Sequence, residues 1–207
     1  MSKPDKNDWP ARLFDDLIEG GVTLFTHVPD SGNAKLIELA NSHNQAQTVL
    51  LTSEEEGVAI CAGADLVGKR AILCMQSSGV GNCPNFLSLV KGGRFPVLMM
   101  ISMRGDYGEQ NPWQYPMGQA VEPILHALGV LTFRVDTADD LKPATNATLA
   151  AVFGGGHGAD GGTGGLPRGT DLHARADRMP RRGDARSDGA APGVVGAPRN
   201  GSRTTRP

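Results

Sequence analysis

The chain has 207 residues, a formal net charge of −2 at pH 7 and an isoelectric point near 6.2. This balance gives no general electrostatic reason to expect nucleic acid or an acidic membrane as a partner. No run of eighteen apolar residues occurs and the first seventeen positions are rich in charge, so neither a membrane-spanning helix nor a signal peptide is predicted. The three cysteines lack CxxC spacing, which is typical of reduced thiols, and we expect a cytoplasmic protein.

The composition changes after residue 153. Residues 154–207 are rich in glycine, arginine and proline and contain no isoleucine, phenylalanine, tyrosine or tryptophan. Such a segment cannot build a hydrophobic core, so we expect it to be a disordered tail. Two origins stay open: a native extension, or an aberrant, frameshift-like C-terminus, because glycine, alanine, arginine and proline have GC-rich codons. The predicted parts are a flexible N-terminus (1–9), one domain (10–153) and the tail (154–207).

Within the domain, the apolar pattern alternates between helical and extended spacing. Residues 10–19 place apolar side chains at helical intervals and end at a pair of glycines, and residues 22–28 then read as a strand. The elements predicted after these are helix 33–40, strand 48–52, helix 54–67, strand 70–75, helix 84–90, strand 96–102, helix 117–128, strand 130–135 and helix 139–151.

Short, all-apolar strands that alternate with helices indicate βαβ units. The predicted fold class is therefore α/β, with a doubly wound, mainly parallel sheet that has helices on both faces. In such a sheet the ligand crevice lies beyond the carboxyl ends of the strands. We expect polar loops to meet at that edge after Val28, Thr52, Met75 and Ser102.

Three consecutive glutamates, residues 54–56, precede a helix that is small or apolar on every face. Ser53 and Glu56 fit a capping box, in which the serine accepts from first-turn amides and the glutamate reaches back. A helix that is apolar all round is typically buried, however, and a carboxylate at its start then lies near the interior or an interface. The pattern alone leaves both a structural and a functional role open for these glutamates.

The stretch SSGVGN, residues 77–82, follows a predicted strand. Its glycines would let backbone amides approach a phosphate, but it lacks the lysine of a P-loop and the spacing of GxGxxG. A tight turn from strand to helix is the simpler interpretation. A flavodoxin-like module that binds a flavin or nucleotide without catalysis is the alternative function that this loop supports.

Four segments taken together resemble a known family. They are HVPDS (27–31), EEEGVAICAGADL (54–66), MQSSGVGN (75–82) and RGDYGEQNPWQYPMG (104–118). Over residues 10–153 the chain resembles the pyrimidine-binding domain of thiamine diphosphate-dependent decarboxylases. Within that family the motifs are most similar to those of sulfopyruvate decarboxylase alpha subunits and phosphonopyruvate decarboxylases.

The resemblance assigns roles to individual residues. The family pattern E-x8-G, placed on Gly63, makes Glu54 the catalytic carboxylate that hydrogen-bonds the aminopyrimidine ring, and a shift of one residue would select Glu55 instead. In the same way the resemblance implies a cofactor pocket formed by Pro29, Glu54, Ser77, Ser78, Gly79, Gly81 and Asn82.

The family's GDG…N motif, which holds the diphosphate through Mg²⁺, does not occur in this sequence. The resemblance therefore implies a separate beta subunit that binds Mg²⁺, with no metal ligand in this chain, and a hetero-oligomer that decarboxylates sulfopyruvate, phosphonopyruvate or a related anionic 2-keto acid. Candidates for contact with the substrate anion are Arg104, Asn111 and Gln114. A non-catalytic remnant that binds no partner is a further hypothesis.

Overall fold

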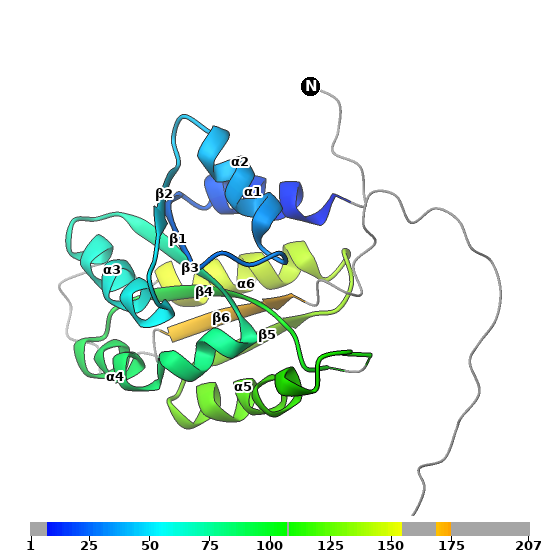
Figure 1. Cartoon of the computed structure of the whole chain (residues 1–207). Coiled ribbons are helices and arrows are strands. Elements are labelled where there is room, and N and C mark those ends of the chain that lie inside the picture. Colours follow the sequence, from blue (N-terminus) through cyan, green and yellow to red (C-terminus); the bar gives the residue numbers. More distant parts are fainter. Residues whose placement is uncertain (1–7, 107, 155–168, 175–207) are drawn as a thin grey trace, which may run out of the picture.

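The computed structural model describes residues 8–106, 108–154 and 169–174. Within them, six strands form one sheet in the order β2-β1-β3-β4-β6-β5, and every neighbouring pair is parallel (Figure 1). The strands are β1 (Val22–His27), β2 (Gln47–Leu50), β3 (Arg70–Gln76), β4 (Val97–Ser102), β5 (Leu131–Val135) and β6 (Gly169–Ala174).

Helices cover both faces of the sheet, which confirms the predicted doubly wound α/β fold (Figure 1). One core cluster lies under α1, α2 and α6, and a second lies under α3, α4 and α5. The helices are α1 (Trp9–Glu19), α2 (Ala34–Ser42), α3 (Glu54–Leu66), α4 (Pro84–Gly93), α5 (Tyr115–Ala127) and α6 (Leu141–Phe153), with short 3-10 helices η1 (Ser77–Asn82) and η2 (Pro112–Gln114). None of these helices is long and apolar enough to cross a membrane.

The central strands divide their side chains between the two cores. In β3, Ile72 and Cys74 belong to the cluster under α1, α2 and α6, whereas Leu73 and Met75 belong to the cluster under α3, α4 and α5. All six residues of β4 are buried. Helices on both faces explain why these strands are continuously apolar, because neither face of the strand meets water.

Strand β6 was not predicted. It lies between β4 and β5, although Gly169–Ala174 belongs to the segment expected to be disordered, so that expectation does not hold for these six residues. The sequence GTDLHA contains glycine, aspartate and histidine, which differ from the apolar run typical of an inner parallel strand. The rest of the predicted tail and most of the predicted flexible N-terminus lie outside the described residues.

The strand order places a crevice beside β1. The chain passes from β1 to β2 on one side and then to β3 on the other, so the connections leave β1 and β3 in opposite directions. Such a reversal opens a crevice beyond the carboxyl ends of the two strands. The segments that follow β1, β2, β3 and β4 meet at this edge, as predicted.

Candidate functional site

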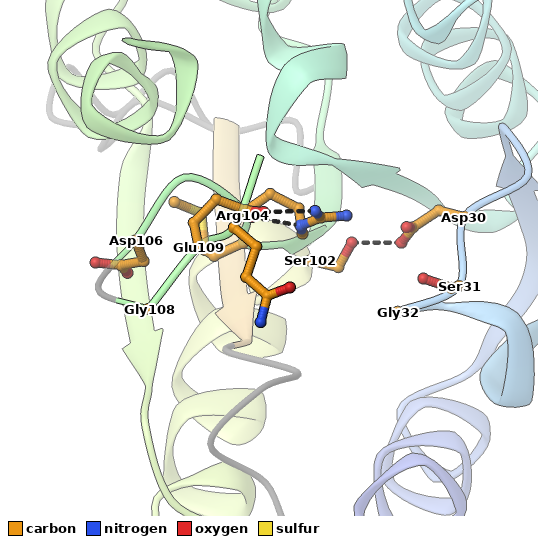
Figure 2. A pocket seen from close by; sticks show the side chains of 10 residues that line it. Asp30, Ser31, Gly32, Ser102, Arg104, Asp106, Gly108 and Glu109 are labelled. Carbon is orange, nitrogen blue, oxygen red and sulfur yellow. Dashed lines mark hydrogen bonds and ion pairs between the residues drawn. The ribbon is translucent and has the colours of Figure 1, made fainter. Parts of the chain in front are cut away.

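Hydrogen bonds join the loop after β1 to the ends of the two central strands. The side chain of Asn33 donates from Nδ2 to the carbonyl oxygen of Met75 at 3.1 Å and to Asp30 Oδ2 at 3.1 Å. The Ser102 hydroxyl also donates to Asp30 Oδ2 (Figure 2). Segments that are more than forty residues apart in sequence are thereby fixed at one edge of the sheet.

Glu54, predicted to be the catalytic carboxylate, is the first residue of α3. It is only 8% exposed, and its Oε2 accepts a hydrogen bond of 2.8 Å from Asn82 Nδ2 in η1. A Cβ placed on Gly79 would lie 2.5 Å from Glu54 Oε1, so the carboxylate lies directly over that glycine. The structure thus brings Glu54, Gly79 and Asn82 together, as the resemblance implied.

The two neighbouring glutamates make local contacts. Glu56 Oε2 accepts from the backbone amide of Thr52 at 2.9 Å, so it does reach back as a cap, one residue further than predicted. Ser53 makes no side-chain cap and instead donates its hydroxyl to Glu55, which corrects the other half of the predicted capping box. The hydrogen bond from Ser53 lowers the pKa of Glu55.

The expectation that α3 is buried on every side is wrong for the described chain. Ala59, Gly63 and Leu66 are exposed, and Leu66 is 74% accessible. These three residues are spaced at i, i+4 and i+7 and therefore lie on one side of the helix, which we call the α3 outward face. No neighbouring atom lies within 4 Å of a Cβ placed on Gly63.

The glycine-rich stretch forms the 3-10 helix η1, where a loop was expected. Ser77 accepts from the amide of Arg104 at 3.1 Å and donates to its carbonyl oxygen at 3.3 Å, so its hydroxyl joins η1 to the segment after β4. Ser78 donates to Gln76 Oε1 at 3.0 Å, and Gly81 lies beside Met117. The hydroxyl groups of Ser77 and Ser78 thus both have hydrogen-bond partners within the protein.

Cys83 closes η1 and faces the interior. Its Sγ donates to the carbonyl oxygen of Gly79 at 3.5 Å. Burial, with smaller contributions from the charges of Glu54 and Glu55, raises the pKa of Cys83 to about 12. Cys61 and Cys74 are also buried and free, so all three cysteines are neutral thiols within the core, as predicted.

Pro29 lies in the loop after β1 and lines a cavity of about 620 Å³ beside α2. His27, Asn33 and Ile37 also line this cavity, and burial lowers the pKa of His27. Glu54, Gly79 and Asn82 are not among its lining residues, so the structure does not bring Pro29 together with them in this cavity.

A second cavity, of about 520 Å³, opens between the loop after β1 and the segment after β4 (Figure 2). It is lined by Asp30, Ser31, Gly32, Ser102, Met103, Arg104, Asp106, Gly108, Glu109 and Gln110. Arg104, predicted to contact the substrate anion, does line it. Its guanidinium is paired with Glu109 through Nε at 2.6 Å and Nη2 at 2.7 Å.

The other two predicted substrate residues are placed differently. Asn111 caps η2, because its Oδ1 accepts from the amide of Trp113 at 3.2 Å. Gln114 ends η2 and packs its backbone against Gly105. Neither residue lines the 520 Å³ cavity. Sequence reasoning missed Glu109, although it belongs to the GEQNPWQ stretch that contributed to the resemblance.

Comparison with known proteins gives close relatives. No protein-family model matches the chain. It is 36% identical over 129 residues to the sulfopyruvate decarboxylase subunit alpha of Methanococcus maripaludis, covering 62% of this chain and 77% of that protein. It is 33% identical over 144 residues to the phosphonopyruvate decarboxylase of Streptomyces viridochromogenes, covering 66% of this chain and 36% of that protein.

A solved structure shares the fold. The 2-oxoglutarate:ferredoxin oxidoreductase from Magnetococcus marinus, solved with 2-oxoglutarate, coenzyme A and succinyl-CoA bound, matches with a TM-score of 0.59 and 14% identity. The match covers 84% of this chain and 29% of that one, which establishes the architecture alone.

The relatives, on a doubly wound α/β fold, define the class: a pyrimidine-binding domain of the thiamine diphosphate-dependent decarboxylases. Within this class, the match to the Methanococcus maripaludis protein, at 36% identity over 77% of its length, identifies the family. The chain belongs to the family of sulfopyruvate decarboxylase alpha subunits.

Proposed function

We propose that the chain supplies one half of the active site of a thiamine diphosphate-dependent decarboxylase that converts 3-sulfopyruvate to sulfoacetaldehyde and carbon dioxide. The observation that carries the proposal is the position of Glu54, held by Asn82 at 2.8 Å and lying over Gly79. The names of the relatives support the choice of substrate, and the phosphonopyruvate decarboxylase keeps phosphonopyruvate as the second candidate.

In this proposal the carboxyl group of Glu54 forms a hydrogen bond with a ring nitrogen of the cofactor. A carboxylate that is 8% exposed, with one oxygen already bound by Asn82, presents a single acidic position to a ligand. Gly79 keeps the backbone close to that carboxylate, because any side chain there would displace it. When bound, thiamine diphosphate supplies the electron sink for the electron pair released as carbon dioxide departs.

In this proposal Glu54 holds a proton at a fixed point and passes it to, or accepts it from, a ring nitrogen of the ligand. Asn82 orients the carboxylate by its hydrogen bond to Oε2, which directs Oε1 toward Gly79. Partial burial strengthens the hydrogen bond between Glu54 and the ligand, because little water competes with it.

We further propose a beta subunit as partner, which binds the diphosphate group through Mg²⁺. The chain matches only 36% of the phosphonopyruvate decarboxylase, so most of that longer protein has no counterpart among the matched residues. Exposed apolar groups also support a partner: the α3 outward face, and the side chain of Trp113 on η2, which is 86% exposed.

Free, buried cysteines fit a reducing compartment, and we place the complex in the cytoplasm.

The proposal is tested by replacing Glu54 in the assembled enzyme. The chain is co-expressed with a sulfopyruvate decarboxylase beta subunit, supplied with thiamine diphosphate and Mg²⁺, and assayed for carbon dioxide release from 3-sulfopyruvate. Because Glu54→Gln removes the acidic proton but keeps the shape, we expect kcat to fall by about 10²- to 10⁴-fold.

Glu55→Gln is the matched control, because it changes the adjacent carboxylate, which is bound to Ser53. We expect this variant to keep nearly full activity. Full activity in Glu54→Gln would contradict the assignment, and loss of activity only in Glu55→Gln would move the catalytic role by one residue.

A further inference from the structure

The two oxygens of the Glu54 carboxyl group have different surroundings. Oε2 accepts a hydrogen bond of 2.8 Å from Asn82 Nδ2. Among the residues that the structure describes, no side chain and no backbone amide donates to Oε1. The residue is buried, so little water reaches the carboxyl group. Oε1 is therefore the oxygen that remains for a ligand.

The chemistry of the amide group decides where a proton can lie on Glu54. The NH₂ group of an asparagine only donates, so the oxygen that faces it must act as an acceptor. In a neutral carboxyl group the carbonyl-type oxygen is the better acceptor, and the hydroxyl-type oxygen carries the proton. The hydrogen bond from Asn82 therefore favours the carbonyl-type oxygen at Oε2 and the proton at Oε1.

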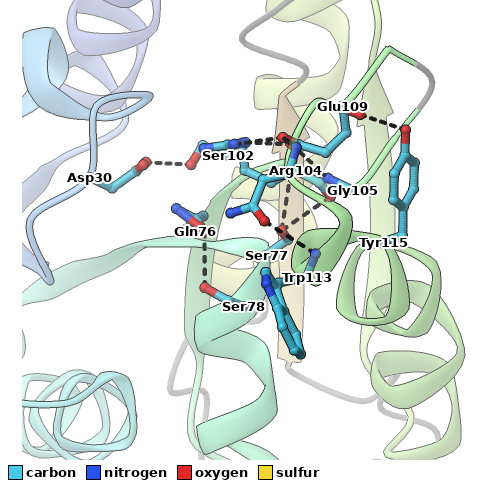
Figure 3. A network of polar contacts seen from close by, with 11 residues as sticks. Asp30, Gln76, Ser77, Ser78, Ser102, Arg104, Gly105, Glu109, Trp113 and Tyr115 are labelled. Carbon is cyan, nitrogen blue, oxygen red and sulfur yellow. Dashed lines mark hydrogen bonds and ion pairs between the residues drawn. The ribbon is translucent and has the colours of Figure 1, made fainter.

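The turn that carries Asn82 is anchored at both ends. Ser77 begins η1, is fully buried, and is bonded through its hydroxyl to the backbone of Arg104 (Figure 3). Cys83 follows η1 and donates from Sγ to the carbonyl oxygen of Gly79 at 3.5 Å. Because both ends of the turn are held, the side chain of Asn82 reaches the carboxyl group from a fixed backbone.

We propose that Asn82 is a positioning residue, which keeps the acidic proton of Glu54 on Oε1 so that this oxygen alone exchanges a proton with the ring nitrogen of the cofactor. This inference rests on the proposed function and deepens it, because it names the atom that holds the proton. It also gives Asn82 a role that acts through the carboxyl group, in place of the direct contact with the cofactor that the resemblance implied.

A reversed amide group would give the opposite arrangement. With Oδ1 of Asn82 toward Glu54, the carboxyl group would donate from Oε2, and its proton would be held away from the ligand. The variant Asn82→Asp, whose ionised carboxylate only accepts, would then serve as well as the wild type. This substitution therefore distinguishes the two arrangements.

In the proposed arrangement Asn82→Asp is harmful. Two carboxylates at hydrogen-bond distance do not both stay charged, so they share one proton between them. That proton is held at Oε2 of Glu54, and Oε1 no longer offers a proton to the ring nitrogen. We expect kcat of the assembled enzyme to fall by about 10²-fold.

Cofactor binding gives a readout that does not depend on activity. Calorimetry on the complex of both subunits, with Mg²⁺ present, compares thiamine diphosphate with an analogue in which C–H replaces the ring nitrogen that meets Glu54. Wild type is expected to bind the analogue about tenfold more weakly, the effect of one lost charged hydrogen bond. In Asn82→Asp the ratio of the two dissociation constants should fall close to one, because thiamine diphosphate loses the same hydrogen bond.

A merely structural role for Asn82 would weaken the binding of both ligands by the same factor. Their ratio would then stay as in wild type, which would overturn the proposal. Binding of thiamine diphosphate by Asn82→Asp as tight as that by wild type would also overturn it, since a donor at this position would not be needed.

Asn85→Asp is the matched control, because it adds the same charge at an exposed position in the first turn of α4. It is expected to leave both dissociation constants and their ratio unchanged.

Asn82→Leu provides a second route if Asn82→Asp does not assemble. It removes the donor without adding a charge, so the proton can occupy either oxygen of Glu54. The ratio of the dissociation constants should then lie between the wild-type value and one. A ratio equal to that of wild type would show that the amide donor does not place the proton, and the proposal would fall.

The outcomes also separate this inference from the proposed function. A wild-type complex that favours thiamine diphosphate over the analogue, with the same ratio in both Asn82 variants, would remove only the role of Asn82. A wild-type complex that binds the two ligands equally would remove the contact between Glu54 and the ring nitrogen, and with it both proposals.

Discussion

At Gly79 the backbone passes so close to Glu54 that a methyl group would come within 2.6 Å of three of its side-chain atoms. The Glu54 carboxylate cannot stay in place beside an alanine there, and it is also held by Asn82 from the other side. Gly79, which the resemblance assigned to the cofactor pocket, is therefore needed for the Glu54 carboxylate to occupy its observed position.

Gly79→Ala is expected to displace Glu54 by roughly 1 Å and to lower kcat of the assembled enzyme by about 10²-fold, because proton transfer depends steeply on position. Gly92→Ala, in α4, is the control, since no atom lies within 4 Å of a Cβ placed there. It should remain close to wild type. Equal activity of the two variants would show that the contact with Glu54 is unimportant.

Sequence reasoning grouped Glu54 with Gly79 and Asn82, which the structure brings together, but did not relate Arg104 to Glu109. The glutamate could be placed because a family pattern fixed its register, and the structure then brought Asn82 and Gly79 to it. The pairing of Arg104 with Glu109 joins residues five apart within an irregular segment, where no helical or strand periodicity relates them. Ser53 was assigned to a cap because its residue type is typical of caps, but its hydroxyl is bound to Glu55.

At the scale of elements, α3 connects the candidate site to an exposed surface. Its first residue is Glu54, its inner side packs on the core through Val58 and Cys61, and its outward face is small and apolar. Such a face on the helix that carries the proposed catalytic residue is where we expect the beta subunit to pack, because exposed apolar surface is typical of an interface.

Gly63→Arg tests this expectation. Nothing lies within 4 Å of a Cβ at Gly63 and arginine favours helix more than glycine does, so the chain should fold normally. A charged side chain buried in the interface should weaken association with the beta subunit by at least about tenfold, as measured by analytical ultracentrifugation. Gly92→Arg, at a second open position in α4, is the control. Normal assembly of Gly63→Arg would place the interface elsewhere.

At the scale of the molecule, the sequence predicted a sheet with helices on both faces, but it did not predict strand β6. Apolar strands such as β4 predicted a sheet covered on both faces, and the predicted boundaries of most elements lie within a few residues of those observed. Strand β6 lies within a segment whose composition is typical of disorder. Its place between β4 and β5 depends on backbone pairing with both neighbours, and residue type did not indicate that pairing.

The central claim is that this chain forms only half of a thiamine diphosphate site and that a beta subunit completes it. Calorimetric titration of thiamine diphosphate with Mg²⁺ into the chain alone, and into the complex of both subunits, tests it most directly. We predict saturable binding by the complex and none by the chain alone. Absence of binding by the complex, or full binding by the chain alone, would contradict the claim.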